Sequence, residues 1–229
     1  GRDRASCRVP GLASRVVRYG CGPHGRWRLD GDLKHFNKIG LRLEGERTCL
    51  VSFSEAHRDD PAYLNWLRNP DVVRTLYLPD YLAGPVPYED VKTYCDRMIR
   101  SETDLFLALI DKTDDRFVGT LKAGHTNWYA GVSDIGIMVG DKDTWGKGFA
   151  QDAIFTLCHY LFQTVGLRKL TSGAMSINPA MIKVFEKLGF QREALLRAQD
   201  RTEDGYCDHV HFGCFPDELR TPTPLANGQ

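Results

Sequence analysis

The sequence predicts a mixed α/β fold with a largely antiparallel sheet. Short segments in which apolar and polar residues alternate, as in strands, are interspersed with segments in which apolar residues recur at helical spacing. Two of the strand-like segments, residues 105–111 and 116–125, are joined by the four polar residues Lys-Thr-Asp-Asp, which is typical of a hairpin turn. A chain of 229 residues suits one domain with a full core plus an extension.

The regular pattern begins near Glu46. A strand is predicted at residues 47–53, where side chains alternate, and a helix begins at Pro61, because proline is favoured in the first helical turn. A second helix is predicted over residues 88–100, which place apolar side chains on one stripe. Three predicted strands follow, at residues 105–111, 116–125 and 133–140.

The second half of the chain alternates helices and strands. A helix is predicted over residues 148–165, with Asp152 in its first turn, where a negative charge is favourable. A strand follows at residues 169–176, and then a helix at residues 179–188, which Gly189 ends. The last two predicted strands lie at residues 190–198 and 206–215.

The first 40 residues differ in composition from the rest. They combine glycine, proline and arginine without a sustained period, so we expect a disordered extension at residues 1–40, one domain at residues 41–219 and a tail at residues 220–229. The extension holds nine basic and three acidic residues, which leaves 21 basic and 27 acidic residues downstream, a net charge of −6. A mildly acidic body disfavours nucleic acid and suits a cationic substrate such as an amine, although the same charge also serves solubility alone.

Neither a membrane span nor a secretion signal is expected. The longest apolar run, residues 105–110, is far shorter than the roughly 20 residues that a span requires, and no signal-peptide pattern begins the chain. The seven cysteines form no Cys-x-x-Cys pair, so a reducing, cytoplasmic setting is expected. In a strand, Cys207, His209 and His211 would share one face while Cys214 would point to the other, so an ordinary terminal strand is expected in preference to a zinc site.

Residues 134–150 read as a strand, a glycine-containing loop and the start of a helix. A helix N-terminus offers unpaired N–H groups and the positive end of the helix dipole, which together favour phosphate. Gly146 and Gly148 would let the backbone approach an anion with no Cβ in the way. Lys147 would add positive charge there or remain solvated.

Other phosphate-binding loops are excluded by spacing. A P-loop needs four residues between its first glycine and the Gly-Lys pair, whereas five separate Gly140 from Gly146. It also needs Ser or Thr after the lysine, where Gly148 stands. A dinucleotide fingerprint needs a third glycine at the position of Gln151.

A specific resemblance appears at residues 134–150, which read Asp-Ile-Gly-Ile-Met-Val-Gly-Asp-Lys-Asp-Thr-Trp-Gly-Lys-Gly-Phe-Ala. The segment resembles the acetyl-CoA motif of the GNAT superfamily, with Trp145 at the position of the usual Gln or Arg, as in the ribosomal-protein N-terminal acetyltransferase branch. Residues 178–190 resemble the second signature, an Asn followed by a helix that ends in Glu-Lys-x-Gly-Phe. The element order agrees over residues 46–216. The resemblance implies a splayed, mostly antiparallel sheet of six to seven strands flanked by about four helices, and an acetyl-CoA-dependent N-acetyltransferase without a metal.

The resemblance also implies a role for each part of the motif. The strand backbone would pair with the pantetheine arm, the loop and first helical turn would bind the pyrophosphate, and Asn178 would contact the cofactor near the thioester. Many relatives have Ser and Tyr where this chain has Met181 and Phe185, so the usual hydroxyl that protonates the leaving thiolate is missing. The residues concerned are Ile137, Met138 and Val139 in the strand, and Gly146, Lys147, Gly148, Phe149 and Ala150 in the loop and helix.

Acetyl transfer to an amine requires the neutral amine, and deprotonating an alkylamine with a pKa of about 10.4 costs roughly 4 kcal/mol near pH 7.4. Asp134 is the first candidate for the base, because acidic residues often serve at this position in relatives; Glu193 and His125 are alternatives. His125, Asn127 and Trp128 lie before the cofactor strand and are candidates for the acceptor site, although Trp128 would equally cap the core. Candidates for the opposite wall are Tyr206, Asp208 and His209.

Three functions fit these observations. The first is acetylation of a primary amine on a small molecule, including a nucleotide-linked amino sugar, because residues 127–128 and 134–150 resemble such bacterial enzymes. The second is Nα-acetylation of a protein terminus. The third is a non-catalytic CoA-binding module, since the hydroxyls are missing at residues 181 and 185. The expected partner is a small-molecule or peptide amine, with neither nucleic acid nor a membrane, and a homodimer is left open.

Overall fold

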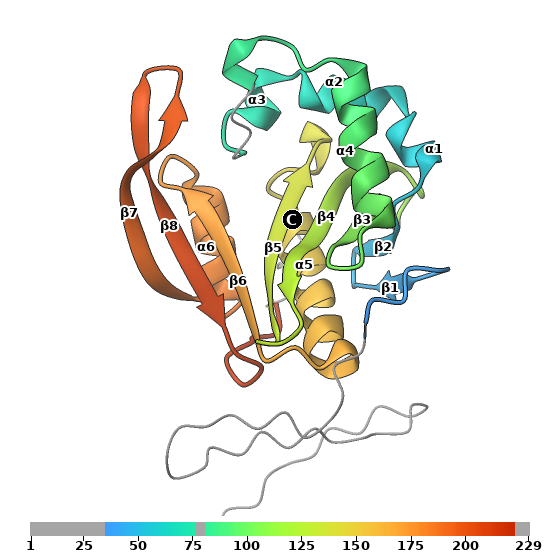
Figure 1. Cartoon of the computed structure of the whole chain (residues 1–229), viewed down its shortest axis with the longest axis vertical. Helices are drawn as coiled ribbons and strands as arrows, with labels where there is room; N and C mark the ends of the chain where they lie inside the picture. Colours follow the sequence, from blue (N-terminus) through green and yellow to red (C-terminus); the bar gives the residue numbers. More distant parts are fainter. Residues whose placement is uncertain (1–34, 77–80, 223–229) are drawn as a thin grey trace, which may run out of the picture. The chain divides into compact units, whose positions relative to one another are not determined.

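The computed structural model describes residues 35–76 and 81–222. Within these residues, eight strands form one sheet in the order β1-β2-β3-β4-β5-β6-β8-β7 (Figure 1). All neighbouring strands are antiparallel except β5 and β6, which are parallel. The predicted mixed α/β fold with a mostly antiparallel sheet is therefore confirmed.

The sheet has one strand more than the six to seven that were expected. The additional strand, β1, has three residues and pairs with β2. Three residues are too few to show alternation, so the sequence does not predict β1. The strands are β1 (Arg42–Glu44), β2 (Thr48–Ser52), β3 (Leu105–Asp111), β4 (Phe117–Asn127), β5 (Val132–Val139), β6 (Lys169–Met175), β7 (Gln191–Thr202) and β8 (Gly205–Cys214).

Six α-helices accompany the sheet in the described residues. Two of them are single turns of four residues, which are too short to show a helical period in the sequence. They are α1 (Glu55–Arg58), α2 (Pro61–Leu67), α3 (Pro70–Val73), α4 (Tyr88–Arg100), α5 (Phe149–Tyr160) and α6 (Pro179–Lys187). Short 3₁₀ turns lie at η1 (Tyr81–Ala83) and η2 (Lys142–Thr144), and a π-helical turn, η3 (Leu161–Val165), continues α5. No helix in the described part of the chain has the length and apolar character needed to cross a membrane.

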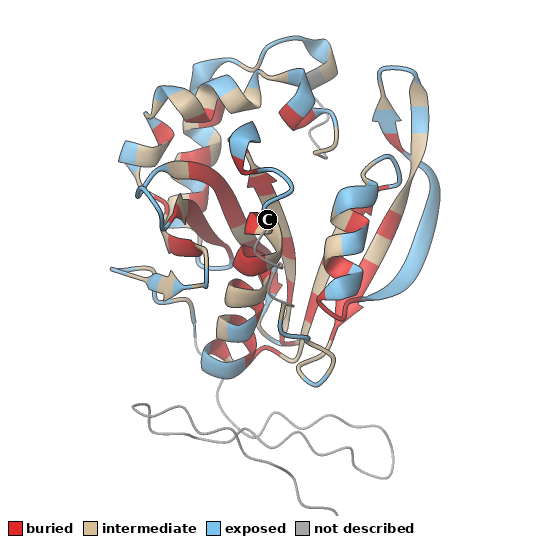
Figure 2. Cartoon of the chain, turned by 180° about the vertical axis from the view of Figure 1, so that it is seen from behind, coloured by how far each residue is buried: buried red, intermediate tan, exposed pale blue. Residues whose placement is uncertain are grey.

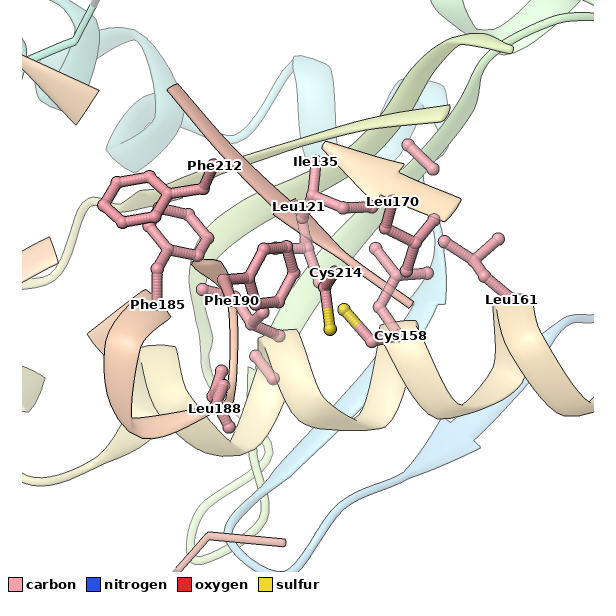
Figure 3. Packing of buried hydrophobic residues seen from close by; sticks show 14 of the residues in the cluster. Leu121, Ile135, Cys158, Leu161, Leu170, Phe185, Leu188, Phe190, Phe212 and Cys214 are labelled. Carbon is pink, nitrogen blue, oxygen red and sulfur yellow. The ribbon is translucent and has the colours of Figure 1, made fainter. Parts of the chain in front are cut away.

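Two hydrophobic clusters lie on opposite faces of the sheet. On one face, α5 and α6 pack against the central strands through residues such as Leu157 and Phe185 (Figures 2 and 3). On the other face, α2, α3 and α4 contribute Tyr63, Val72 and Val91 to a smaller cluster. Strand β5 serves both clusters, as its predicted alternation requires, because Ile135, Ile137 and Val139 join the first while Met138 joins the second.

The Asp152 carboxylate connects α5 to the turn between β1 and β2. It accepts hydrogen bonds from the backbone N–H groups of Glu46 (2.9 Å), Arg47 (3.1 Å) and Thr48 (2.9 Å), and from the Thr48 hydroxyl (2.6 Å). A buried carboxylate is tolerated when its oxygens are satisfied in this way. The first turn of α5 is thereby attached to the sheet, which positions the loop before it.

Residues 35–40 contact the domain, whereas residues 1–34 lie outside the described residues. The Phe36 and Trp128 rings have centroids 4.8 Å apart, and Lys38 Nζ donates to the carbonyls of Met98 (3.2 Å) and Ile99 (3.3 Å). Lys38 thus satisfies carbonyls at the C-terminus of α4. At the other end, the Arg220 N–H donates to Leu188 O (2.9 Å), so the tail is still attached at its first residue.

Deleting residues 1–34 is expected to leave the melting temperature within a few degrees of the full chain. Deleting residues 1–40 is expected to lower it by more, because the Phe36 and Lys38 contacts are lost. A loss of 1 kcal/mol shifts a domain of this size by about 2–4 °C. Thermal melts of the two truncated chains beside the full chain measure the difference. A large drop for the first deletion would contradict the view of residues 1–34 as dispensable.

Candidate active site

Strands β5 and β6 pair along only part of their length. Hydrogen-bonded register runs from Val132 to Ile135 in β5 and from Lys169 to Ser172 in β6. Beyond it, β5 remains paired with β4 and β6 with β8, and the two strands diverge (Figure 1). This divergence, here called the split, leaves the backbone of residues 136–139 with no described strand on the side facing β6. An extended ligand can add to such an exposed edge as a strand would.

The loop after β5 has a conformation that requires glycine at two positions. Gly146 has φ 74° and Gly148, the N-cap of α5, has φ 83°, both in the left-handed region. A Cβ added at Gly146 would meet nothing within 4 Å, so the space beside the backbone is open. The first intrahelical bond runs from Asp152 N to Gly148 O (3.0 Å), which leaves the preceding N–H groups of Phe149 and Ala150 at the helix end. Such an end suits a phosphate.

Trp145 connects this loop to the end of β5. Its indole Nε1 donates to Val139 O at 2.9 Å, and its ring is partly exposed. The loop therefore lies directly beyond the open end of the split. Lys147, next in the loop, is exposed.

A cavity of about 720 Å³ lies at the split and is lined from both sides of the sheet. Of the residues predicted to bind the cofactor, Ile137, Met138 and Asn178 line it, whereas the loop residues 146–150 lie outside its lining. Asn178 is also the N-cap of α6, where its Oδ1 accepts from Met181 N (3.2 Å). The cavity volume lies in the range of small-molecule sites.

Asp134 lines the same cavity at the end of the split where β5 and β6 are still paired, here called the sealed end. Its Oδ2 accepts a hydrogen bond from Thr171 Oγ1 in β6 (3.0 Å). Burial raises the pKa of the Asp134 carboxyl, against the opposing effects of the Thr171 hydrogen bond and the positive charge of Lys122. A carboxylate with a raised pKa is a better proton acceptor than an ordinary aspartate.

The three residues predicted to bind the acceptor are not among the cavity-lining residues. Asn127 and Trp128 lie at the β4–β5 turn, where Asn127 Oδ1 accepts from Ala130 N (2.9 Å) and Trp128 packs against Phe36. His125 is exposed, and its backbone N–H donates to Asp104 Oδ1 (2.9 Å). These residues miss the cavity because they come just before β5, and the first residues of β5 pair with β6, so the preceding turn lies at the sealed end of the split. Their role in acceptor binding stays a prediction.

Of the other candidates, only His209 lines the cavity. Glu193 pairs with Lys169 (2.7 Å), Asp208 accepts from Ala198 N (2.8 Å), and Tyr206 is exposed. No group of three His, Cys, Asp or Glu side chains in the described residues could hold a metal ion.

Several cavity residues gave no signal in the sequence. They come from three separate elements, α4, β4 and β7, and only the tertiary structure brings them together; they are Tyr94, Lys122 and Asp200. The sequence shows His209 and His211 at alternate positions of the predicted terminal strand, but it does not show that Asp200 in β7 is the partner of His209. This is because β7 shifts register before Asp200, so its alternation does not show which side chains point inward.

Phe185, at the position where the resemblance implies a tyrosine, is a core residue. Its side chain is 2% exposed, and its ring centroid lies 5.2 Å from that of Phe190 and 5.4 Å from that of Phe212 (Figure 3). Aromatic groups at these separations stabilise one another beyond the area they bury. Phe185 therefore contributes to packing beneath the cavity.

Phe185→Ala is expected to lower the free energy of unfolding by about 3–5 kcal/mol, because it leaves a cavity beside the Phe190 and Phe212 rings. Phe185→Tyr is expected to change turnover by less than about tenfold, because the thiol leaving group that the resemblance implies has a cysteine-like pKa of about 8.5 and would leave as thiolate at a cost of roughly 1.4 kcal/mol at pH 7.5. Denaturant titration and steady-state kinetics measure the two effects. A hundredfold gain in Phe185→Tyr would show instead that thiolate departure limits the natural protein.

The split beside a helix N-terminus that suits phosphate defines a class of protein, one whose site fits an extended, phosphate-bearing ligand. Comparison with known proteins identifies the family. Residues 47–191 match the model of the acetyltransferase (GNAT) domain, and the chain belongs to this family. It is an acyltransferase.

Relatives and solved structures agree with this assignment. The chain is 30% identical over 150 residues to an uncharacterized N-acetyltransferase, p20, from Bacillus licheniformis, covering 66% of this chain and 83% of the relative. A solved spermidine N-acetyltransferase from Vibrio cholerae, in complex with CoA and spermine, has a TM-score of 0.67 at 16% identity and covers 75% and 97% of the two chains. A ribosomal L7/L12 alpha-N-protein acetyltransferase in complex with coenzyme A has a TM-score of 0.67 at 15% identity and covers 78% and 99%. These two structures show the same fold.

Proposed function

We propose that this protein transfers the acetyl group of acetyl-CoA to a primary amine of a small molecule. The observation that carries the proposal is the split, whose cavity is lined by an unpaired strand edge and by a carboxylate with a raised pKa, with the open glycine loop just beyond the end of β5. Acetyl-CoA supplies the acetyl group as a thioester. Its pantetheine arm would lie along residues 137–139, and its pyrophosphate would lie at residues 146–150.

The loop supports this cofactor because the backbone there is open to an anion. Gly146 and Gly148 hold left-handed conformations, no side chain fills the space beside Gly146, and the N–H groups of Phe149 and Ala150 lie at the N-terminus of α5. Asn178 would lie near the reacting end, since it lines the cavity between the two strands. Free thiols at all five described cysteines are in keeping with a reducing, cytoplasmic setting.

The charged residues that line the cavity support a cationic amine as the acceptor. Three aspartates line the cavity, Asp90, Asp134 and Asp200, whereas Lys122 is the one lysine among the described residues in its lining. Asp134 would accept the proton of the bound ammonium group, which must be lost before the nitrogen can attack a carbonyl. A cavity of about 720 Å³ favours a small molecule over a folded protein terminus.

Release of free thiol from acetyl-CoA, measured with a panel of amines, tests the function. The panel contains alkyl polyamines, amino acids, a nucleotide-linked amino sugar and peptides with free N-termini. Turnover of a small-molecule amine with release of one thiol per acetylated product is the expected result. Turnover of peptides alone would favour Nα-acetylation, and CoA binding without thiol release for any amine would favour a non-catalytic module.

A further inference from the structure

The last two strands place an imidazole and a carboxylate in contact on the cavity wall. His209 Nδ1 in β8 lies 2.6 Å from Asp200 Oδ2 in β7. The Asp200 side chain is 1% exposed and that of His209 is 14% exposed, and both line the cavity. The proposed function assigns no role to this pair.

A β-bulge turns Asp200 inward. The register of β7 shifts between Leu196 and Asp200, and Ala198 within the shift has φ 49°. The Ala198 N–H donates to Asp208 Oδ1 (2.8 Å), which holds the bulge. Asp200 is the one buried residue of β7, whose other residues are exposed or half-buried. Bulges commonly re-aim a side chain beside an active site.

The other imidazole nitrogen lies over the edge of the split. A Cβ added at Gly173 in β6 would lie 2.1 Å from His209 Nε2, so the ring packs directly on the Gly173 backbone. Thr171, which binds Asp134, lies two residues before Gly173 and therefore on the same face of β6. Asp134 in β5 and His209 Nε2, which lies over β6, thus line the cavity on one face of the sheet.

Acetylation of an ammonium group releases two protons from the nitrogen. The first must leave before attack, and the proposed function gives it to Asp134. The second leaves as the C–N bond forms and the C–S bond breaks, with the electron pair of the C–S bond going to sulfur. We propose that His209 is a catalytic residue that accepts this second proton at Nε2 and returns it to the sulfur or to water. This inference rests on the proposed function.

Asp200 is the positioning residue of the pair. By accepting Nδ1–H, it holds the imidazole in the tautomer whose Nε2 carries the lone pair, and it stabilises the imidazolium that forms. Its Oδ1 is buried and has no hydrogen-bond partner among the described residues. Charged and titratable groups near His209 include Asp200 in β7 and His211 in β8 (ring centroids 4.9 Å apart), and Asp134 and Lys122 line the same cavity.

His209→Gln tests the proposal through the pH dependence of turnover. We expect kcat to fall by about 10²- to 10⁴-fold, the usual contribution of a positioned base. The loss should persist as pH rises, because the second proton leaves during the reaction itself. By contrast, the loss in Asp134→Asn should narrow as the amine loses its first proton to solvent. His159→Gln, the same change at an exposed position of α5, serves as the control and should keep the wild-type rate.

The double variant Asp200→Asn/His209→Gln tests whether Asp200 acts through His209. It should be no slower than His209→Gln alone, because residues that act as a unit are not additive. Melting temperature and acetyl-CoA affinity establish that each variant is folded. If His209→Gln does not fold because the Asp200 carboxylate has lost its partner, the double variant is used in its place, since it also removes the buried charge. Wild-type kcat in folded His209→Gln, or a loss that disappears at high pH, would overturn the proposal. Absence of thiol release by the wild-type protein would instead reject the proposed function.

Discussion

Gly146→Val and Gly148→Val are expected to weaken acetyl-CoA binding by about 10²- to 10⁴-fold. Both glycines have positive φ, and valine there would both strain the backbone and place a Cβ where phosphate oxygens meet N–H groups. Losing two charge-assisted hydrogen bonds at about 1.5–3 kcal/mol each accounts for this range. Titration calorimetry with CoA measures the affinity directly.

Gly166→Val is the matched control for Gly146→Val. Gly166 also has a left-handed backbone, φ 85°, and open space around an added Cβ, but it lies after η3, at the far end of α5. The control should lose stability through the same backbone strain while keeping its affinity for CoA. If folded Gly146→Val binds CoA as tightly as the wild type, the loop is not the pyrophosphate site.

Asp134→Asn is expected to lower kcat by about 10²- to 10⁴-fold at low pH, with a smaller loss at high pH. The amide cannot take the ammonium proton, and an amine with a pKa of about 10.4 is increasingly deprotonated by solvent as pH rises. Acetyl-CoA affinity should stay nearly unchanged. Glu193→Gln, which alters an acid paired with Lys169 outside the cavity, is the matched control. Wild-type rates across pH 6–9 would reduce Asp134 to a structural role.

The raised pKa of Asp134 also has consequences for pH dependence. In the wild type, the acidic limb of kcat/KM that reports Asp134 should lie above the ordinary aspartate value of about 3.9, since burial disfavours the charged form. Because the folded state holds this proton more tightly than the unfolded state, the ionised carboxyl lowers stability at pH values above that range. At neutral pH, Asp134→Asn should therefore be at least as stable as the wild type. Thermal melts at neutral pH check this.

Elements with a strong local period could be predicted closely. Helix α4 and strand β3 begin and end at the predicted residues, Tyr88–Arg100 and Leu105–Asp111. In each, the spacing of apolar side chains directly reflects which face is buried. The single-turn helices α1 and α3 and the strand β1 are too short to display a period, and they depend on caps and pairing with distant segments.

The sequence by itself determined the family and the place of the glycine loop, because strand, loop and helix N-terminus are contiguous in residues 134–150. Their geometry is local, so the motif could be read without knowledge of the fold. Only the tertiary structure decided which residues meet at the cavity. Trp128 packs against Phe36 at the sealed end, whereas Asp200 reaches His209 after a bulge in β7 and lines the same cavity as Asp134. Strand order and register bring these side chains together over long chain separations, and neither leaves a periodic signal in the sequence.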